Sequence, residues 1–315
     1  MTYIQQYMQE KKWLVYLAVI FAMIFWAFSF VWVKEVYTVY GPLTTVLFRL
    51  VIASMLLMAF AFLTGKMVKI ERKDLTAFIL LSLFEPFLYF MGESFGLLYV
   101  SSTVGAIIVA TIPLFSPIAA SRFHGEKLSV RTFVGIIISF LGVSVVVFDN
   151  SFNLTASPLG ISLEFLAVAS AIGYIVVLKK LAVKYNPSAI IAYQNLFGIV
   201  YFLPLWLIFE YKDFTAIPFD FPAFAGILKL SVFASCIAFI FYAHSVKRLG
   251  INSVNIFINI IPVFTAIFAW YILDEPLTLR KFVGIVIVIS GLLLAQVKLR
   301  KATERIVAIQ QDAGR

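Results

Sequence analysis

The chain has 315 residues, of which 62% are hydrophobic and only 13% are charged, and its formal net charge is +9. Soluble domains carry about 25% charged residues, so this composition excludes a soluble globular protein and predicts that lipid surrounds most of the chain. The basic residues lie mainly in connecting segments and in the tail, as in membrane proteins, which argues against nucleic-acid binding. The single cysteine, Cys236, excludes an internal disulfide bond.

Ten apolar segments are long enough to cross a bilayer, which takes about 20 mostly apolar residues. The first segment follows Lys11 and Lys12 and is too long for a cleavable signal peptide. We therefore predict an all-α integral membrane protein with ten transmembrane helices. In chain order the predicted helices are Trp13–Val33, Gly41–Leu63, Leu75–Val100, Thr103–Phe123, Val130–Val147, Pro158–Leu178, Pro187–Phe209, Pro222–Val246, Ile251–Leu273 and Leu279–Val297.

Lysine and arginine residues in the connecting segments predict how these helices are oriented. With the N-terminus inside, the inner segments contain 19 lysines and arginines and the outer segments contain 4. Cytoplasmic segments of membrane proteins are enriched in these residues. We therefore expect a multi-pass protein of the plasma membrane (inner membrane), with both termini in the cytoplasm.

A long block of the sequence is duplicated. Residues 113–142 recur at 262–291, and every matched residue lies 149 positions later. Each copy contains an apolar run, a tight turn with a glutamate, and a second apolar run. The glutamates, Glu126 and Glu275, are expected at the start of the following helix, where negative charge is favourable. Glycines spaced seven residues apart are expected to allow close helix contact; they are Gly135 and Gly142 in the first copy and Gly284 and Gly291 in the second.

The duplication divides the chain into two five-helix repeats, at residues 1–150 and 151–298, followed by a basic cytoplasmic tail at 299–315. Because each repeat has an odd number of helices, the second must cross the membrane in the opposite orientation. Glu126 is then expected inside and Glu275 outside. Inverted repeats of this kind are common in transporters that work by alternating access.

These duplicated blocks resemble the EamA family of the drug/metabolite transporter superfamily, and the resemblance covers nearly the whole chain. The segment Trp26–Phe30 and the residue Arg49 fit the family as well, although Ala27 stands where the family usually has glycine. In the second half, Gln194 stands where an arginine would match Arg49. The resemblance implies ten helices in two inverted repeats, a central substrate cavity and export of small metabolites such as amino acids. It does not imply a particular substrate.

Four charged residues are predicted to lie at a similar depth in the membrane, roughly 9 to 12 Å from the outer helix ends at about 1.5 Å of rise per residue. Ionisable groups inside a membrane are costly, so each is a functional candidate. They are Arg49, Glu93, Glu164 and Lys229. Two interpretations stay open. The layer forms structural ion pairs or snorkels to the surface, or it binds a zwitterion such as an amino acid.

Glu85 is predicted near the middle of the membrane, directly before Pro86 and without a cation at its depth. Proline removes a backbone hydrogen bond and kinks a helix, which can open space for water. A carboxyl group in such a place can stay protonated and carry a coupling proton. The alternative is a neutral acid bonded to a carbonyl oxygen. Tyr89, one turn further along, is placed to hydrogen-bond Glu85.

Aromatic and amide residues deep inside the spans form a second set of candidates. They line a cavity in the functional interpretation and bridge helices by hydrogen bonds in the structural one. Together with Arg49, Tyr89 and Glu93, the predicted substrate-binding residues are Trp26, Phe30, Tyr174, Tyr193, Gln194, Asn255 and Asn259.

The sequence contains no phosphate-binding glycine loop, no His/Cys metal cluster and no nucleophile motif, so we expect neither an enzyme nor a cofactor. We expect a membrane transporter that exports small polar metabolites, such as amino acids, by alternating access and with proton coupling through Glu85. Its expected partners are the lipid bilayer and a small-molecule substrate, and a homodimer stays open. The alternatives are uptake, uncoupled exchange or, in a different class, an intramembrane transferase.

Overall fold

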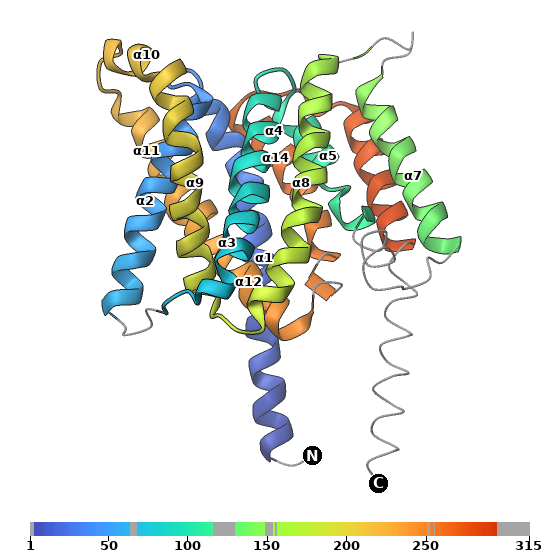
Figure 1. Cartoon of the computed structure of the whole chain (residues 1–315). Coiled ribbons are helices and arrows are strands. Elements are labelled where there is room, and N and C mark those ends of the chain that lie inside the picture. The colour runs from blue at the N-terminus through green and yellow to red at the C-terminus, as the bar shows by residue number, and fades with distance from the viewer. Residues whose placement is uncertain are drawn as a thin grey trace.

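The computed structural model of the chain describes residues 3–63, 68–115, 130–148, 154, 156–250, 253–254 and 256–294. Within these ranges the protein is helical and contains no β-strand, apart from one isolated bridge between Phe148 and Leu154. The helices form a bundle whose members run roughly in one direction (Figure 1). The prediction of an all-α fold is confirmed.

Twelve α-helices carry labels in the described part of the chain. They are α1 (Tyr3–Val36), α2 (Pro42–Leu63), α3 (Leu75–Ser82), α4 (Tyr89–Gly96), α5 (Ser102–Val109), α7 (Val130–Val147), α8 (Pro158–Ala182), α9 (Pro187–Phe209), α10 (Tyr211–Ala216), α11 (Phe221–Lys229), α12 (Phe239–Leu249) and α14 (Ile260–Ile272). Four short 3-10 or π segments adjoin them, namely η1 (Arg72–Asp74), η2 (Leu83–Leu88), η3 (Leu230–Ala238) and η4 (Ile256–Asn259). Residues 279–294 form a further helix.

Six helical runs in the described ranges are long and apolar enough to cross a membrane. They are Trp13–Val36, Pro42–Leu63, Arg72–Gly96, Pro158–Ala182, Pro187–Phe209 and Phe221–Leu249. Three shorter apolar helices are Ser102–Phe115, Phe133–Val147 and Phe257–Ile272. Each of them overlaps a predicted segment, and the ends of the six long runs differ from the predicted ends by up to four residues. These lengths agree with a multi-pass membrane protein; the count of ten stays a prediction.

Two of the spans depart from regular α-helical geometry near their centres. In the first, the backbone of Glu85 leaves the helical region, with φ −144° and ψ 120°, between α3 and α4. The expected break at Pro86 is therefore confirmed. In the second, the π segment η3 separates α11 from α12. Irregular backbone at membrane depth is tolerated where it lines a polar cavity or is covered by protein, so these breaks indicate where a site can form.

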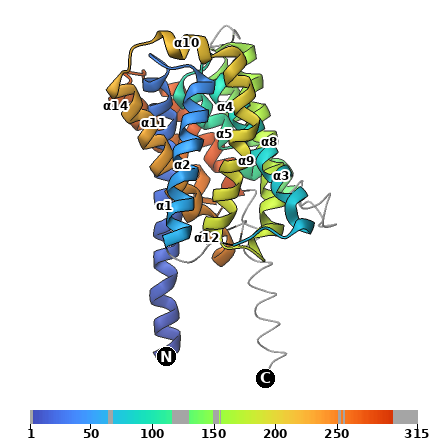
Figure 2. The same cartoon turned by 60° about the vertical axis from the view of Figure 1, so that its left-hand side comes forward.

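Helices from the first half of the chain pack mainly on helices from the second half. α2 lies along α9, α1 packs on α12 and α14, and α8 packs on α4 and α5. Figure 2 shows α2 in front of α1, and α1 (blue) extending below the other described helices at the end opposite α10. The two halves therefore share one bundle, and each of its two hydrophobic clusters contains residues from both halves.

The last helices of the two halves touch through the glycines of the duplicated block. A Cβ on Gly142 would lie 3.0 Å from the carbonyl oxygen of Gly284, and a Cβ on Gly291 would lie 2.6 Å from that of Gly135. Between these contacts, the Ser139 hydroxyl donates to a backbone oxygen 149 residues further along the chain, at a distance of 3.0 Å. The serine contact joins corresponding positions of the duplicated blocks, and exchanging the two blocks converts one glycine contact into the other. The predicted close approach of these helices is confirmed.

Candidate substrate cavity

A cavity lies beside the break at Glu85, with walls from both halves of the chain. It contains about 640 Å³ of empty space, counting the space at its mouth. The lining comes from α1, α2, η2, α4, α5, α8, α12, η4 and α14, together with Ile112. Seven predicted residues are part of this lining: Trp26, Phe30, Arg49, Glu85, Tyr89, Glu93 and Tyr174.

Arg49 supplies the positive charge of the cavity. Its side chain is 2% exposed, and its Nε donates a hydrogen bond to the Ser235 hydroxyl at 2.9 Å. The guanidinium carbon lies 4.3 Å from the ring centroid of Phe90, within the range of a cation–π contact. Ser235 belongs to η3, so the second half of the chain positions a cation carried by α2.

Two carboxyl groups face the same cavity. The Tyr89 hydroxyl donates a hydrogen bond to Glu93 at 3.0 Å, and not to Glu85 as predicted. Glu85 lies in the break of its helix. Both are 6% exposed. The charge of Arg49 interacts with both of them, which corrects the expectation that Glu85 has no cation at its depth. Among the described residues, however, no carboxylate lies within ion-pair distance of Arg49. The cavity therefore holds one cation and two acids that are close but not locked together.

Aromatic rings form much of the remaining wall. The Trp26 ring lies 5.1 Å from that of Phe239 and 5.2 Å from that of Tyr242, centroid to centroid. The Trp26 indole N–H donates to the backbone oxygen of Ala234 at 3.3 Å, which fixes the ring. Apolar walls with a few converging polar groups are typical of small-molecule sites.

The structure does not place every candidate in the lining. Tyr193 donates its hydroxyl to the backbone oxygen of Val68 at 2.9 Å and packs edge-on against Phe78. Gln194 and Asn259 are buried but outside the lining. Asn255 lies outside the described residues. Substrate binding by any of the candidates stays a prediction.

The predicted layer of four charges is only partly assembled. Lys229 is exposed on the outside of the bundle, whereas Glu164 is completely buried between helices. No ion pair among the described residues joins any two of the four. The interpretation as two structural ion pairs is therefore wrong, because equal depth along a helix does not place side chains on facing sides.

Several lining residues carried no signal in the sequence. Phe90, Phe239 and Tyr242 lie in apolar runs rich in similar residues. A charged residue inside a span stands out in the sequence because burying a charge in the membrane is energetically costly. One aromatic residue among many similar ones does not stand out in this way. The side of the helix it occupies depends on the packing of distant segments.

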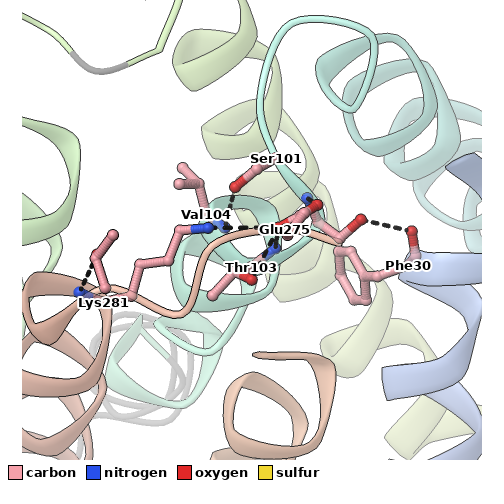
Figure 3. A network of polar contacts seen from close by, with 8 residues as sticks. Phe30, Ser101, Thr103, Val104, Glu275 and Lys281 are labelled. Carbon is pink, nitrogen blue, oxygen red and sulfur yellow. Dashed lines mark hydrogen bonds and ion pairs between the residues drawn. The ribbon is translucent and has the colours of Figure 1, made fainter. Parts of the chain in front are cut away.

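Glu275 forms a polar network at the end of the bundle where α10 lies (Figures 1 and 3). Its carboxylate accepts hydrogen bonds from the backbone N–H of Ser102 at 2.8 Å and from the N–H and hydroxyl of Thr103 at 3.4 and 3.0 Å. The Ser102 hydroxyl donates to the backbone oxygen of Phe30, whose side chain lines the cavity. Lys281 Nζ lies 3.5 Å from the same carboxylate.

This network corrects the expectation for Glu275. Its carboxylate caps the N-terminus of α5, not the start of the helix that follows it. Burial raises the pKa of Glu275, but the hydrogen bonds from Ser102 and Thr103 and the charge of Lys281 outweigh that effect and hold the pKa below its ordinary value. The corresponding Glu126 lies outside the described residues.

Glu210 makes a similar contact at the same end of the bundle. Its carboxylate accepts from the backbone N–H groups of Leu43 and Thr44, at 3.0 and 2.7 Å, and from the Thr44 hydroxyl at 2.7 Å. The indole N–H of Trp206 also donates to that hydroxyl oxygen. Free N–H groups at a helix start are favourable partners for a carboxylate. In both contacts an acid from the second half caps a helix of the first.

The site offers no arrangement for a metal ion in the part of the chain that the structure describes. No group of three or more His, Cys, Asp or Glu side chains comes together there. The one cysteine, Cys236, is buried and unpaired, and its thiol points to the backbone oxygen of Ala53. The chemistry available to the cavity is therefore that of an arginine, carboxyl groups, hydroxyl groups and aromatic rings.

Comparison with known proteins identifies the family. The profile of the EamA-like transporter family matches the chain twice, at residues 13–148 and 158–296. An uncharacterized transporter of Archaeoglobus fulgidus is 28% identical over 282 residues, which cover 90% of this chain and 97% of that protein. The uncharacterized transporter YetK of Bacillus subtilis is 26% identical over 258 residues, covering 79% of this chain and 77% of its own length.

A solved crystal structure has a similar fold. It superposes with a TM-score of 0.68 at 14% sequence identity and covers 91% of this chain and 98% of its own. Identity this low supports the fold alone. The two profile matches, by contrast, cover most of the sequence, and this multi-pass membrane protein belongs to the EamA-like transporter family.

Proposed function

We propose that this transporter exports small polar metabolites, such as amino acids, across the plasma membrane by alternating access and in exchange for protons. The observation that carries the proposal is the cavity in which Arg49, Glu85 and Glu93 meet between aromatic walls. A metabolite with both a carboxylate and an ammonium group matches this combination of charges.

The charges suggest how such a substrate binds. Its carboxylate pairs with the guanidinium of Arg49, which has no carboxylate within ion-pair distance among the described residues. Its ammonium group pairs with Glu93, whose orientation is fixed by the hydroxyl of Tyr89. Charged groups buried in a protein need partners to offset the loss of water, so a zwitterion completes the cavity better than an apolar solute does.

The arrangement of the two halves supports alternating access. α2 packs along α9, the pairs α1–α12 and α8–α4 correspond between the halves, and the last helices meet through the glycines of the duplicated blocks. These contacts fit two five-helix repeats inserted in opposite orientations. In transporters built this way the substrate site lies between the repeats, beside broken helices, which is where the cavity lies.

Protons are proposed as the coupling ion because of Glu85. This carboxyl lines the cavity, lies at an interruption of its helix and is 6% exposed. Proton binding to Glu85 neutralises one of the two acids that face Arg49. With Glu85 protonated, the cavity has one charged acid and one arginine, which match the two charges of a zwitterion. With both acids charged, the cavity has an excess negative charge and binds the zwitterion with a different affinity. Protonation of Glu85 can therefore alter substrate affinity during the cycle.

The proposed orientation places the N-terminus and the positively charged segments in the cytoplasm, following the charge bias of 19 inner against 4 outer lysines and arginines. The Glu275 network then lies at the outer end of the bundle, because α1 starts at the other end (Figure 1). Its contact with the backbone of Phe30 connects the outer end to the cavity.

The experiment is release of solutes from liposomes. Purified protein is reconstituted, the vesicles are loaded with a mixture of amino acids, nucleosides and sugars, and the released compounds are identified by mass spectrometry with and without a pH gradient. We expect selective release of amino acids that a gradient accelerates, and loss of this acceleration in Glu85→Gln. Selective release by the wild type at the same rate with and without the pH gradient would contradict proton coupling.

A matched pair of arginine variants tests the cavity. Arg49→Lys keeps the positive charge but loses the planar donor set that binds a carboxylate at two points. We expect release to fall on the order of tenfold, which corresponds to about 1.4 kcal/mol. Arg248→Lys makes the same change at an exposed position and should release solutes like the wild type. Equal release by both variants would contradict substrate binding by Arg49.

A further inference from the structure

Glu164 is a buried acid that substrate binding does not use. It lies in α8, is 0% exposed and is not part of the cavity lining. Neither of its carboxyl oxygens has a hydrogen-bond partner among the described residues. A buried ionised carboxylate without a partner is strongly unfavourable, so the observed arrangement suits the protonated, neutral form of this side chain.

The packing around Glu164 keeps a space for its carboxyl group. A Cβ on Gly96 of α4 would lie 2.9 Å from Glu164 Oε1, and a Cβ on Gly105 of α5 would lie 3.0 Å from the same oxygen. One turn back, a Cβ on Gly92 would lie 2.5 Å from the backbone oxygen of Leu163. Three helices therefore meet around this side chain, and glycines leave room for it on two of them. An apolar residue could fill the same space without the cost of burying an acid.

Two charged groups lie on opposite sides of Glu164. On the cavity side, Glu93 follows the glycine that touches α8, and its charge interacts with that of Glu164. On the outer side, Lys34 of α1 donates to the backbone oxygen of Leu97, the residue after Gly96. The charge of Lys34 interacts with both Glu164 and Glu275. Lys34 thus lies between the acid at the outer end and the buried acid.

We propose that Glu164 is a proton-binding site that passes protons between the outer end of the bundle and the acids of the substrate cavity. The order of groups is Lys34 at the outer end, then Glu164, then Glu93 with Tyr89. This inference rests on the proposed function, because it supplies the route for the protons that drive export. It separates that route from the substrate's own path through the cavity.

The two protonation states of Glu164 imply two positions for Lys34. When Glu164 is neutral, Lys34 bonds the Leu97 backbone, as observed. When Glu164 gives its proton to Glu93, the new carboxylate attracts the ammonium group of Lys34. That movement weakens the interaction of Lys34 with Glu275. The groups that face Glu164 from neighbouring elements in the described ranges are Glu93 and Tyr89 on α4 and Lys34 on α1; α5 contributes Gly105.

The functional test compares two modes of transport by Glu164→Gln, in which an amide of the same size replaces the acid. Vesicles hold a mixture of unlabelled amino acids, and the outside holds the same mixture labelled with ¹³C and ¹⁵N. Exchange is measured at equal pH on both sides, and net release is measured with a pH gradient. Glu35→Gln, at an exposed position next to Lys34, is the matched control.

We expect Glu164→Gln to lose the acceleration of release by the gradient, while exchange at equal pH persists. Glu35→Gln should behave like the wild type in both modes. If the gradient still accelerates release by Glu164→Gln as in the wild type, the proposal is wrong. If folded Glu164→Gln loses exchange as well, Glu164 acts in transport itself and the proposal is also wrong.

A second measurement keeps the proposal testable even if the wild type transports none of the amino acids, which would contradict the proposed function alone. Infrared difference spectra, recorded while pH is varied, detect the C=O stretch of protonated carboxyl groups. We expect one buried carboxyl band to appear and disappear with pH in the wild type and in Glu35→Gln and to be absent in Glu164→Gln. Identical spectra for all three proteins would overturn the assignment of a proton site to Glu164.

Discussion

The acids at the outer end of the bundle differ from the acids at its centre. Glu210 and Glu275 each accept three hydrogen bonds from the first residues of a helix. Glu85 and Glu164 are more deeply buried, yet the described residues supply no such set of donors to either of them. Glu93 is intermediate and has one tyrosine hydroxyl as a donor.

The number of hydrogen-bond donors to each acid separates structural from functional charges in this protein. A carboxylate bonded to free N–H groups at a helix start stabilises the fold and has little reason to change its protonation state. A buried acid without such donors is stabilised when it reversibly binds a proton or a substrate. The outer acids therefore belong to the framework, and the central acids belong to the transport cycle.

The largest effect is expected at the centre, on transport. Glu93→Gln removes the charge proposed to pair with the substrate ammonium group but keeps the shape of the side chain. A hydrogen bond to a charged group is worth about 1.5–3 kcal/mol, so we expect amino-acid release from liposomes to fall roughly tenfold to a hundredfold. Glu35→Gln is the control and should release amino acids like the wild type. Release by Glu93→Gln within about twofold of the wild type would contradict the role of Glu93.

The next largest effect is expected at the outer end, on stability. Glu210→Gln removes one of the two carboxylate oxygens that accept from Leu43 and Thr44. Leaving a buried donor unpaired costs about 1–3 kcal/mol, so thermal unfolding in detergent should occur at lower temperature. Net release per folded protein should stay near that of the wild type. A loss of release without a change in unfolding would mean that Glu210 belongs with the central acids.

The pH dependence of stability sharpens the comparison further. The folded pKa of Glu275 lies below its ordinary value of 4.5. Its contribution to stability is therefore complete above the unfolded pKa and is lost as pH falls through the lower folded pKa. We expect the unfolding temperature to drop as pH falls below about 4.5, and to drop less in Glu275→Gln. Parallel curves for the two proteins would show that Glu275 contributes no pH-dependent stability.

The smallest effect is expected at a third kind of acid, exposed at the opposite end of the bundle. Lys184 lies 2.6 Å from Glu71 and 2.5 Å from Asp74, between the ends of α8 and α3. Exposed ion pairs contribute little and are screened by salt. Lys184→Gln should lower the unfolding temperature less than Glu210→Gln does, and high salt should abolish the difference from the wild type. A larger effect would mean that charge pairs at the surface also hold the fold together.

Much of the fold could be predicted from the sequence because the membrane restricts the solutions. A long apolar run has to be a helix in lipid, and Pro86 predicts the break between α3 and α4. Arg49, Glu85 and Glu93 were recognisable because a charge at membrane depth is costly, and all three line the cavity.

The remaining features depend on which side of each helix faces inward. Lys229 was expected beside the central charges, but it lies just before the π segment η3 and faces outward. A π segment alters the rotation of a helix, so the sequence spacing alone misplaces the side chain. Likewise, Glu275 caps a helix that begins 173 positions earlier in the chain, and the sequence around Glu275 does not predict this contact.

The most direct test of this division uses Arg49→Gln and Glu275→Gln, each measured for both unfolding temperature in detergent and gradient-driven release from liposomes. We expect the two variants to differ in opposite ways in release and in unfolding temperature. Arg49→Gln should lose most of its release whatever its stability, and Glu275→Gln should lose stability but keep selective release per folded protein. If Arg49→Gln releases amino acids like the wild type, or if stable Glu275→Gln releases none, the division between framework and transport charges is contradicted.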